Sequence, residues 1–100
     1  MPDDPDVKAI VRAVASYLRV NPNACDTADG IQRWWLLTQP EYPMSKVVLA
    51  LDWMVRRSVI SVSSAADGRR RFRRNSTDAQ LIALAEQEDD SDAVLSPPRN

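Results

Sequence analysis

The stretch VVLALDWMVRRSVI, residues 47–60, joins a helical pattern to an extended one. Its apolar residues Val47, Leu51 and Met54 are separated by four and then three positions, which places them on one face of an α-helix. Ile60 follows six positions later, in a segment where apolar and polar residues alternate as in a β-strand. The pattern predicts a helix that leads into a strand, with both apolar faces turned to one core.

A first helix is predicted near the N-terminus. It runs from Asp6, its expected N-cap, to about Val20, where the sequence Asn-Pro-Asn stops it. Its apolar residues recur at helical spacing and define a single buried face: Val7, Ile10, Val11, Val14 and Leu18.

A second helix is predicted to begin at Asp26 or Thr27 and to continue through ADGIQRWWLL. It should bury Ile31 and Trp34, with Trp35 either beside them or at the border of the core. Adjacent residues on a helix point about 100° apart, so both rings cannot enter the core equally. We interpret the tryptophans as core or interface residues rather than as a stacking platform for single-stranded bases.

Two capping signals frame the rest of the chain. Ser45 is expected to cap the helix that contains residues 47–56. Thr77, with Gln80 three positions later, matches a capping box and predicts a fourth helix, whose narrow apolar stripe includes Leu81 and Leu84.

A β-hairpin is predicted between the third and fourth helices. Asp67 and Gly68 supply the turn, and pairing of Val62 with Phe72 puts both apolar side chains on one face. The second strand holds five arginines in six positions: Arg69, Arg70, Arg71, Arg73 and Arg74. Arg70 and Arg74 should share the face of Phe72, and the other three should lie on the solvated face.

Charge is unevenly distributed along the 100 residues, although the net charge is only −1. Residues 1–75 hold 12 basic and 8 acidic side chains, whereas residues 76–100 hold 1 basic and 6 acidic ones. Near-neutrality therefore hides a basic domain and an acidic C-terminal segment. The basic part suggests a polyanionic partner.

The order of three helices and a hairpin, over roughly residues 6–75, resembles the winged helix-turn-helix superfamily. The resemblance is sharpest at Val47, Leu51, Met54 and Ile60, which fall at the core spacings of that family's third helix and first wing strand. It implies an α+β, mostly helical fold, with a three-helix core and a two-stranded β wing. The family often has glycine where this chain has Ser58, and the link between the second and third helices is longer here.

The expected organisation is a disordered N-terminus at residues 1–5, a winged-helix domain with an added C-terminal helix at residues 6–88, and a flexible acidic tail at residues 89–100. The resemblance implies a DNA-binding protein, expected to regulate transcription by binding duplex DNA through the third helix and the wing. The residues expected to contact DNA are Ser45, Lys46, Leu49, Arg56, Arg69, Arg70, Arg71, Arg73 and Arg74. The arginines should hold phosphates, because the planar guanidinium binds phosphate oxygens bidentately.

Other interpretations of the same residues remain open. A charge run can simply keep an edge strand soluble, although one or two charges of either sign suffice for that. The scaffold can also act as a protein–protein adaptor that docks an acidic partner through Leu49, Trp53 and the wing, and Leu49 with Trp53 is a candidate homodimer contact. Asp52 on the third helix would repel phosphate. The acidic tail either folds back on the wing as a nucleic-acid mimic or is simply solvated.

Catalysis and metal binding find little support in the sequence. The chain has no histidine, the commonest general base, and its two glycines form no phosphate-binding loop. The single cysteine, Cys25, cannot form an internal disulfide or a structural zinc site. We therefore expect no enzyme activity, no catalytic residues, no cofactor and no metal. The acidic start and the lack of a long apolar run predict a cytoplasmic protein with no membrane partner.

Overall fold

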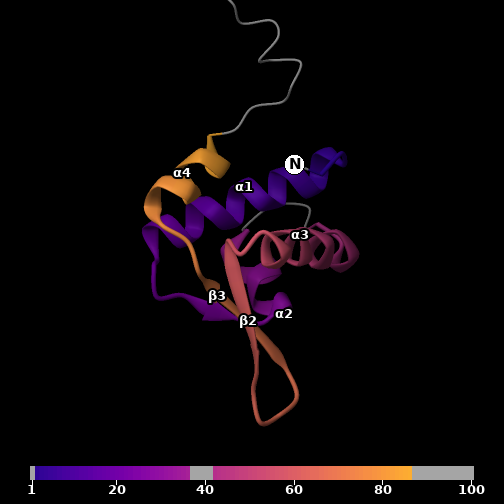
Figure 1. Ribbon diagram of the computed structural model, residues 1–100. Helices are drawn as coiled ribbons and strands as arrows, with labels where there is room; N and C mark the ends of the chain where they lie inside the picture. The colour runs from indigo at the N-terminus through magenta and orange to yellow at the C-terminus, as the bar shows by residue number, and fades with distance from the viewer. Residues whose placement is uncertain (1, 37–41, 87–100) are drawn as a thin grey trace, which may run out of the picture.

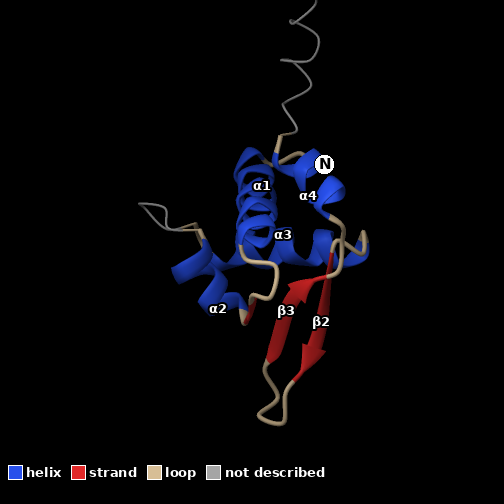
Figure 2. Ribbon diagram, turned by 90° about the vertical axis from the view of Figure 1, so that its left-hand side faces the viewer, coloured by secondary structure: helices blue, strands red, loops and turns tan. Residues whose placement is uncertain are grey.

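The computed structural model describes residues 2–36 and 42–86, which form a small α+β domain of helices and a three-stranded antiparallel sheet (Figure 1). Figure 2 shows the helices gathered at one end, while the strands extend away from them as a projecting hairpin. In chain order the elements are α1 (Pro5–Val20), β1 (Cys25–Asp26), α2 (Ala28–Gly30), the π-helical η1 (Ile31–Trp35), α3 (Met44–Arg56), β2 (Ile60–Ser64), β3 (Arg70–Arg74) and α4 (Asp78–Ala85).

The N-cap of helix α1 lies two residues before the predicted one. Asp4, not Asp6, has the extended backbone of an N-cap, and its Oδ1 accepts a hydrogen bond from the backbone N–H of Asp6 at 2.8 Å. Pro5 explains the shift, because its fixed φ suits the first helical position. The predicted apolar face is confirmed, and its members are nearly or fully inaccessible: Val7, Ile10, Val11, Val14 and Leu18.

The second helical segment is capped by Thr27, whose Oγ1 accepts a hydrogen bond from the N–H of Gly30 at 3.3 Å. The helix then widens into the π-helical η1, so the tryptophans take the opposite places from those predicted. Trp35 is 6% exposed and stacks on Tyr17 of α1, with ring centroids 4.7 Å apart, whereas Trp34 is 64% exposed. The prediction that Trp34 enters the core is therefore wrong.

Helix α3 contributes the predicted core residues. Val47, Leu51 and Met54, together with Ile60 at the start of β2, are each at most 1% exposed. Ser45 does not cap this helix, because Pro43 occupies the N-cap position with an extended backbone and no side-chain hydrogen bond.

The C-terminal end of α3 is closed by paired backbone hydrogen bonds. The N–H of Val59 donates to the carbonyl of Met54, and the N–H of Ser58 donates to that of Val55, both at 2.9 Å. Together they form a Schellman motif with Ser58 in the left-handed position, at φ +60°. This turn sends the chain from α3 into β2.

The sheet has the strand order β1-β3-β2. The predicted register is confirmed, since Val62 of β2 lies opposite Phe72 of β3. The expectation of two strands is incomplete, because β1 pairs with β3 through Cys25 opposite Arg73 and Asp26 opposite Phe72. The arginine-bearing strand β3 is therefore the central strand.

Helix α4 completes the core from the other side of α1 (Figures 1 and 2). Its predicted capping box is confirmed, with Thr77 Oγ1 accepting from the N–H of Gln80 and Gln80 Oε1 accepting from the N–H of Thr77. Leu81 is fully buried and Leu84 is partly buried against the core.

Two predictions fall outside the described residues, namely the acidic tail at residues 89–100 and most of the long link before α3. Within residues 2–36 and 42–86, no helix combines the length and apolar character needed to cross a bilayer.

Candidate functional site

The arginines of the β2–β3 hairpin are presented by the sheet register. Strand β3 places Arg71 opposite Ser63 and Arg73 opposite Ser61, so no carboxylate faces them across the strand pair. Arg69 precedes β3 in the turn, where its backbone N–H donates to Asp67 Oδ1 at 2.9 Å. The hairpin that carries these arginines projects from the domain (Figure 1).

The hairpin arginines differ in their partners. Arg69, Arg70 and Arg73 are exposed and form no ion pair with any residue in the described part of the chain. The Arg70 guanidinium lies 5.9 Å from the centroid of the Phe72 ring, on the same face of the sheet, as predicted. Arg71 makes a long contact with Asp67, with 3.9 Å between Nη2 and Oδ2. These four guanidinium groups are accessible to an external anion.

Arg74 is the exception in this run. Its side chain is 19% exposed, its Nη2 lies 2.8 Å from Asp78 Oδ1, and its Nε donates to the carbonyl of Ser76 at 2.7 Å. Arg74 therefore ties the end of β3 to the start of α4, which is a structural role. It was predicted to contact DNA, but it lies apart from the accessible guanidinium groups.

The cations of α3 are also engaged within the protein. Lys46 Nζ lies 2.8 Å from Asp6 Oδ2 and 3.3 Å from Asp4 Oδ2. The hydrogen bond to Asp6 raises the pKa of Lys46 above its ordinary value, with Asp4 adding to the effect. Arg56 pairs with Asp52 one turn earlier at 2.9 Å, on the exposed face of the helix. Neither cation projects unpaired toward solvent.

The remaining exposed positions of α3 are largely apolar. Val48 is 42% and Leu49 is 54% exposed, while Ser45 contributes only a hydroxyl. Trp53 is partly buried, and the Arg57 guanidinium lies 4.7 Å from the centroid of its ring. The face of α3 therefore offers few groups able to read base edges, which are contacted mainly by Arg, Asn and Gln.

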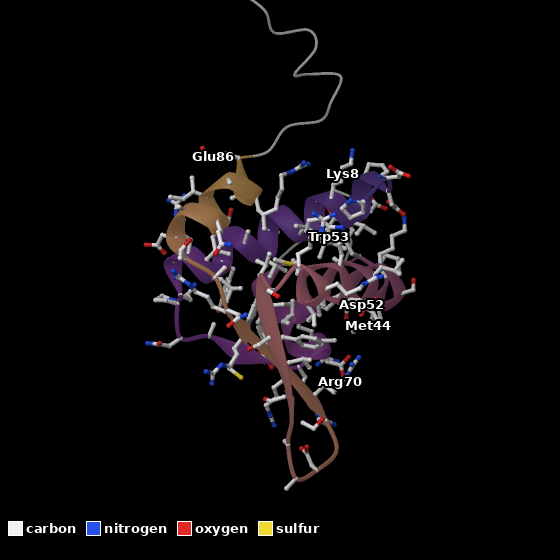
Figure 3. The ribbon with its side chains drawn as sticks, in the orientation of Figure 1. Lys8, Met44, Asp52, Trp53, Arg70 and Glu86 are labelled. Atoms are coloured by element: carbon white, nitrogen blue, oxygen red, sulfur yellow. The ribbon has the colours of Figure 1, made fainter. Side chains whose placement is uncertain are left out.

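The structure brings this face of α3 and the hairpin together around a groove of about 430 Å³, which the sequence analysis missed. Its apolar floor comes from α3 and the sheet: Met44, Val48, Val55, Val62 and Phe72. The hairpin contributes Arg69 and Arg70 to its lining, α2 contributes Asp29 and α3 contributes Asp52. Figure 3 shows Met44 and Asp52 on the side of α3 that faces Arg70.

A signal for this groove was present in the sequence. Met44, Val48, Asp52 and Val55 are spaced by four, four and three, which is a second helical stripe beside the buried one. Its position opposite the hairpin depends on how the sheet packs on α3, which spacing alone does not determine.

Among the described residues, no group of three cysteine, aspartate or glutamate side chains is placed to hold a metal ion. Comparison of the chain with models of protein families, with curated proteins and with solved structures finds no match in any of the three.

Proposed function

We propose that this chain is a winged-helix protein that binds duplex DNA chiefly through its phosphates, with the β2–β3 hairpin as the wing. One observation carries the proposal: Arg69, Arg70 and Arg73 are exposed on a projecting hairpin and form no ion pair within the described residues. A duplex carries a phosphate charge every ~1.7 Å along its axis, so a strand of guanidinium groups fits it well. Regulation of transcription is the use we expect for such a protein.

The sheet topology supports this proposal over edge protection. Strand β3 has β2 along one side and β1 beside Phe72 and Arg73 on the other, so much of its backbone is already paired. Charges that protect against aggregation belong on the outer strands. Four arginines on the central strand, with Arg69 directly before it, need a different explanation, and an external polyanion provides one.

The character of α3 shapes the kind of binding we propose. Lys46 and Arg56 are held by carboxylates, and the exposed Val48 and Leu49 could at most touch thymine methyl groups. Phosphate contacts fix register and orientation but carry no sequence information. We therefore expect strong salt dependence and weak discrimination between sequences.

The test is fluorescence anisotropy of a labelled random duplex titrated with the protein at about 50 and 200 mM salt. If Arg69, Arg71 and Arg73 each neutralise one phosphate, this change in salt should weaken binding through them by about 40-fold. Replacing all three by alanine should lower affinity at the lower salt and remove this share of the salt dependence.

A matched control removes charge elsewhere. The variant Arg19→Ala with Arg33→Ala changes exposed arginines of α1 and η1, and it should be compared with Arg69→Ala with Arg73→Ala. The hairpin pair should weaken binding much more than the control pair. Equal losses from the two variants would mean that only net charge matters, and the hairpin would no longer be the site.

The groove favours a second candidate, a protein-binding module. An apolar floor between α3 and the hairpin is typical of a surface that holds another polypeptide. If the folded protein shows no binding to duplex DNA at about 50 mM salt, that result would favour a protein-binding module over a DNA-binding protein.

A further inference from the structure

The groove between α3 and the hairpin combines an apolar floor with arginines from the hairpin and carboxylates from α2 and α3. Val48 and Phe72 belong to its floor, Arg70 comes from the hairpin, and Asp52, which pairs with Arg56, comes from α3. Such a site suits a segment that has an apolar centre, carboxylates on one side and few cations. Double-stranded DNA lacks the apolar part, so the groove calls for a different ligand from the one proposed for the wing.

The chain itself contains a segment of this chemistry beyond the described residues. Residues 88–95 read EDDSDAVL, in which four carboxylates are followed directly by Ala93, Val94 and Leu95. The acidic part complements Arg69 and Arg70, and the apolar part complements the groove floor.

We propose that the groove binds residues 88–95 of a second copy of this chain. The carboxylates lie at Arg69 and Arg70, and Val94 with Leu95 covers the apolar floor. The contact needs only the groove and does not rest on DNA binding. If both hold, the segment competes with phosphates for the same arginines and lowers DNA affinity.

The position of Glu86 is the reason for assigning the segment to a second copy. Figure 3 places Glu86, at the end of α4, on the side of the molecule away from Arg70. Val94 lies eight positions after Glu86, and an extended chain advances at most ~3.3–3.6 Å per residue. A path within one copy would have to curve around the helices, whereas a neighbouring copy can present the segment directly.

Disulfide trapping in the full chain tests the contact. In a Cys25→Ser background, which removes the native thiol, Val48→Cys is combined with Val94→Cys, and oxidation by glutathione disulfide is followed on non-reducing gels. Val48 is 42% exposed, so its replacement should leave the fold intact, and circular dichroism checks this. We expect a cross-linked dimer that forms about tenfold faster than in the matched control Ser16→Cys with Val94→Cys, because binding raises the effective concentration of the thiols.

Charge reversal provides a second measurement on the same pair. Adding Arg69→Glu and Arg70→Glu should slow cross-linking severalfold, and about 0.5 M salt should slow it as well, because exposed charges are screened. Equal rates for the Val48→Cys and Ser16→Cys pairs would overturn the proposal, as would a rate indifferent to both charge reversal and salt. A cross-linked monomer would overturn the assignment to a second copy.

Discussion

At the scale of single residues, Ser58 adopts a backbone conformation that is unfavourable for a residue with a side chain. It occupies the left-handed position of the Schellman motif that closes α3, with φ +60°. A residue with a Cβ pays roughly 1–2 kcal/mol in this conformation, and glycine avoids that strain. We predict that Ser58→Gly raises the free energy of unfolding by about 1 kcal/mol, measured by urea denaturation.

The variant Ser58→Ala serves as the control for this prediction. It keeps the Cβ and removes only the hydroxyl, so it should leave the free energy of unfolding nearly unchanged. The hydrogen bond from the Asn75 side chain, donated by Nδ2 to the backbone carbonyl of Ser58 at 3.1 Å, is available in all three proteins. A destabilised Ser58→Gly variant would contradict the prediction, and a destabilised Ser58→Ala variant would show that the serine hydroxyl contributes to the stability of this turn.

Single residues also mark the limit of sequence-based prediction. The apolar spacing correctly placed Val47, Leu51 and Met54 in the core, because helical periodicity requires them to share a face. The same reasoning failed for the tryptophans, since the π-helical turn at Ile31–Trp35 changes the angle between successive side chains. The pairing of Lys46 with Asp6 was also beyond prediction, because 40 residues separate them in the chain.

At the scale of secondary-structure elements, the start of α1 is linked to the start of α3 by charge. Asp4 caps α1, and the hydrogen bond donated by the N–H of Asp6 lowers the pKa of Asp4 below its ordinary value of 3.8, with Lys46 lowering it further. A carboxyl with a lowered folded-state pKa stabilises the protein above its unfolded pKa and loses this effect as the pH falls through the folded value. The link between α1 and α3 should therefore weaken in acid.

We predict that the protein is more stable than its Asp4→Asn variant at about pH 7, that this difference shrinks as the pH falls below the ordinary Asp4 pKa of 3.8, and that it disappears below the lowered folded-state pKa. Asparagine is the matched replacement, because it can still cap the helix but carries no charge. Urea denaturation of both proteins from about pH 7 to about pH 2.5 measures the difference. A difference that persists unchanged in acid would mean that the charge of Asp4 contributes nothing.

The secondary-structure elements differ in how well the sequence predicts them. The hairpin register was predictable because a turn with Gly68 fixes which residues pair, and Val62 opposite Phe72 follows. Strand β1 was not predictable from the sequence, because a strand of two residues shows no periodicity. Its pairing with β3 depends on how α1 and α2 position it. The groove depends on the same long-range packing, which explains why only its α3 stripe was visible.

At the scale of the whole molecule, the residues that fold the chain and the residues proposed to bind lie in different places. The buried residues come from the helices and the base of the sheet, and none of the hairpin arginines belongs to the core. Arg71 and Arg73 face serines across the strand pair, so the cations repel one another without a compensating carboxylate opposite. A cluster of this kind adds little to folding, and binding accounts for it better.

This separation predicts that replacing Arg69, Arg71 and Arg73 together by alanine changes the free energy of unfolding by less than about 1 kcal/mol, even though DNA affinity falls. Exposed like charges are screened over ~10 Å at 0.1 M salt, so raising the salt should stabilise the unmodified protein more than the variant. Urea denaturation at about 50 and 500 mM salt measures both effects. A loss of about 3 kcal/mol or more would instead assign these arginines to the stability of the hairpin, and weakened DNA binding by the variant would then reflect a damaged fold.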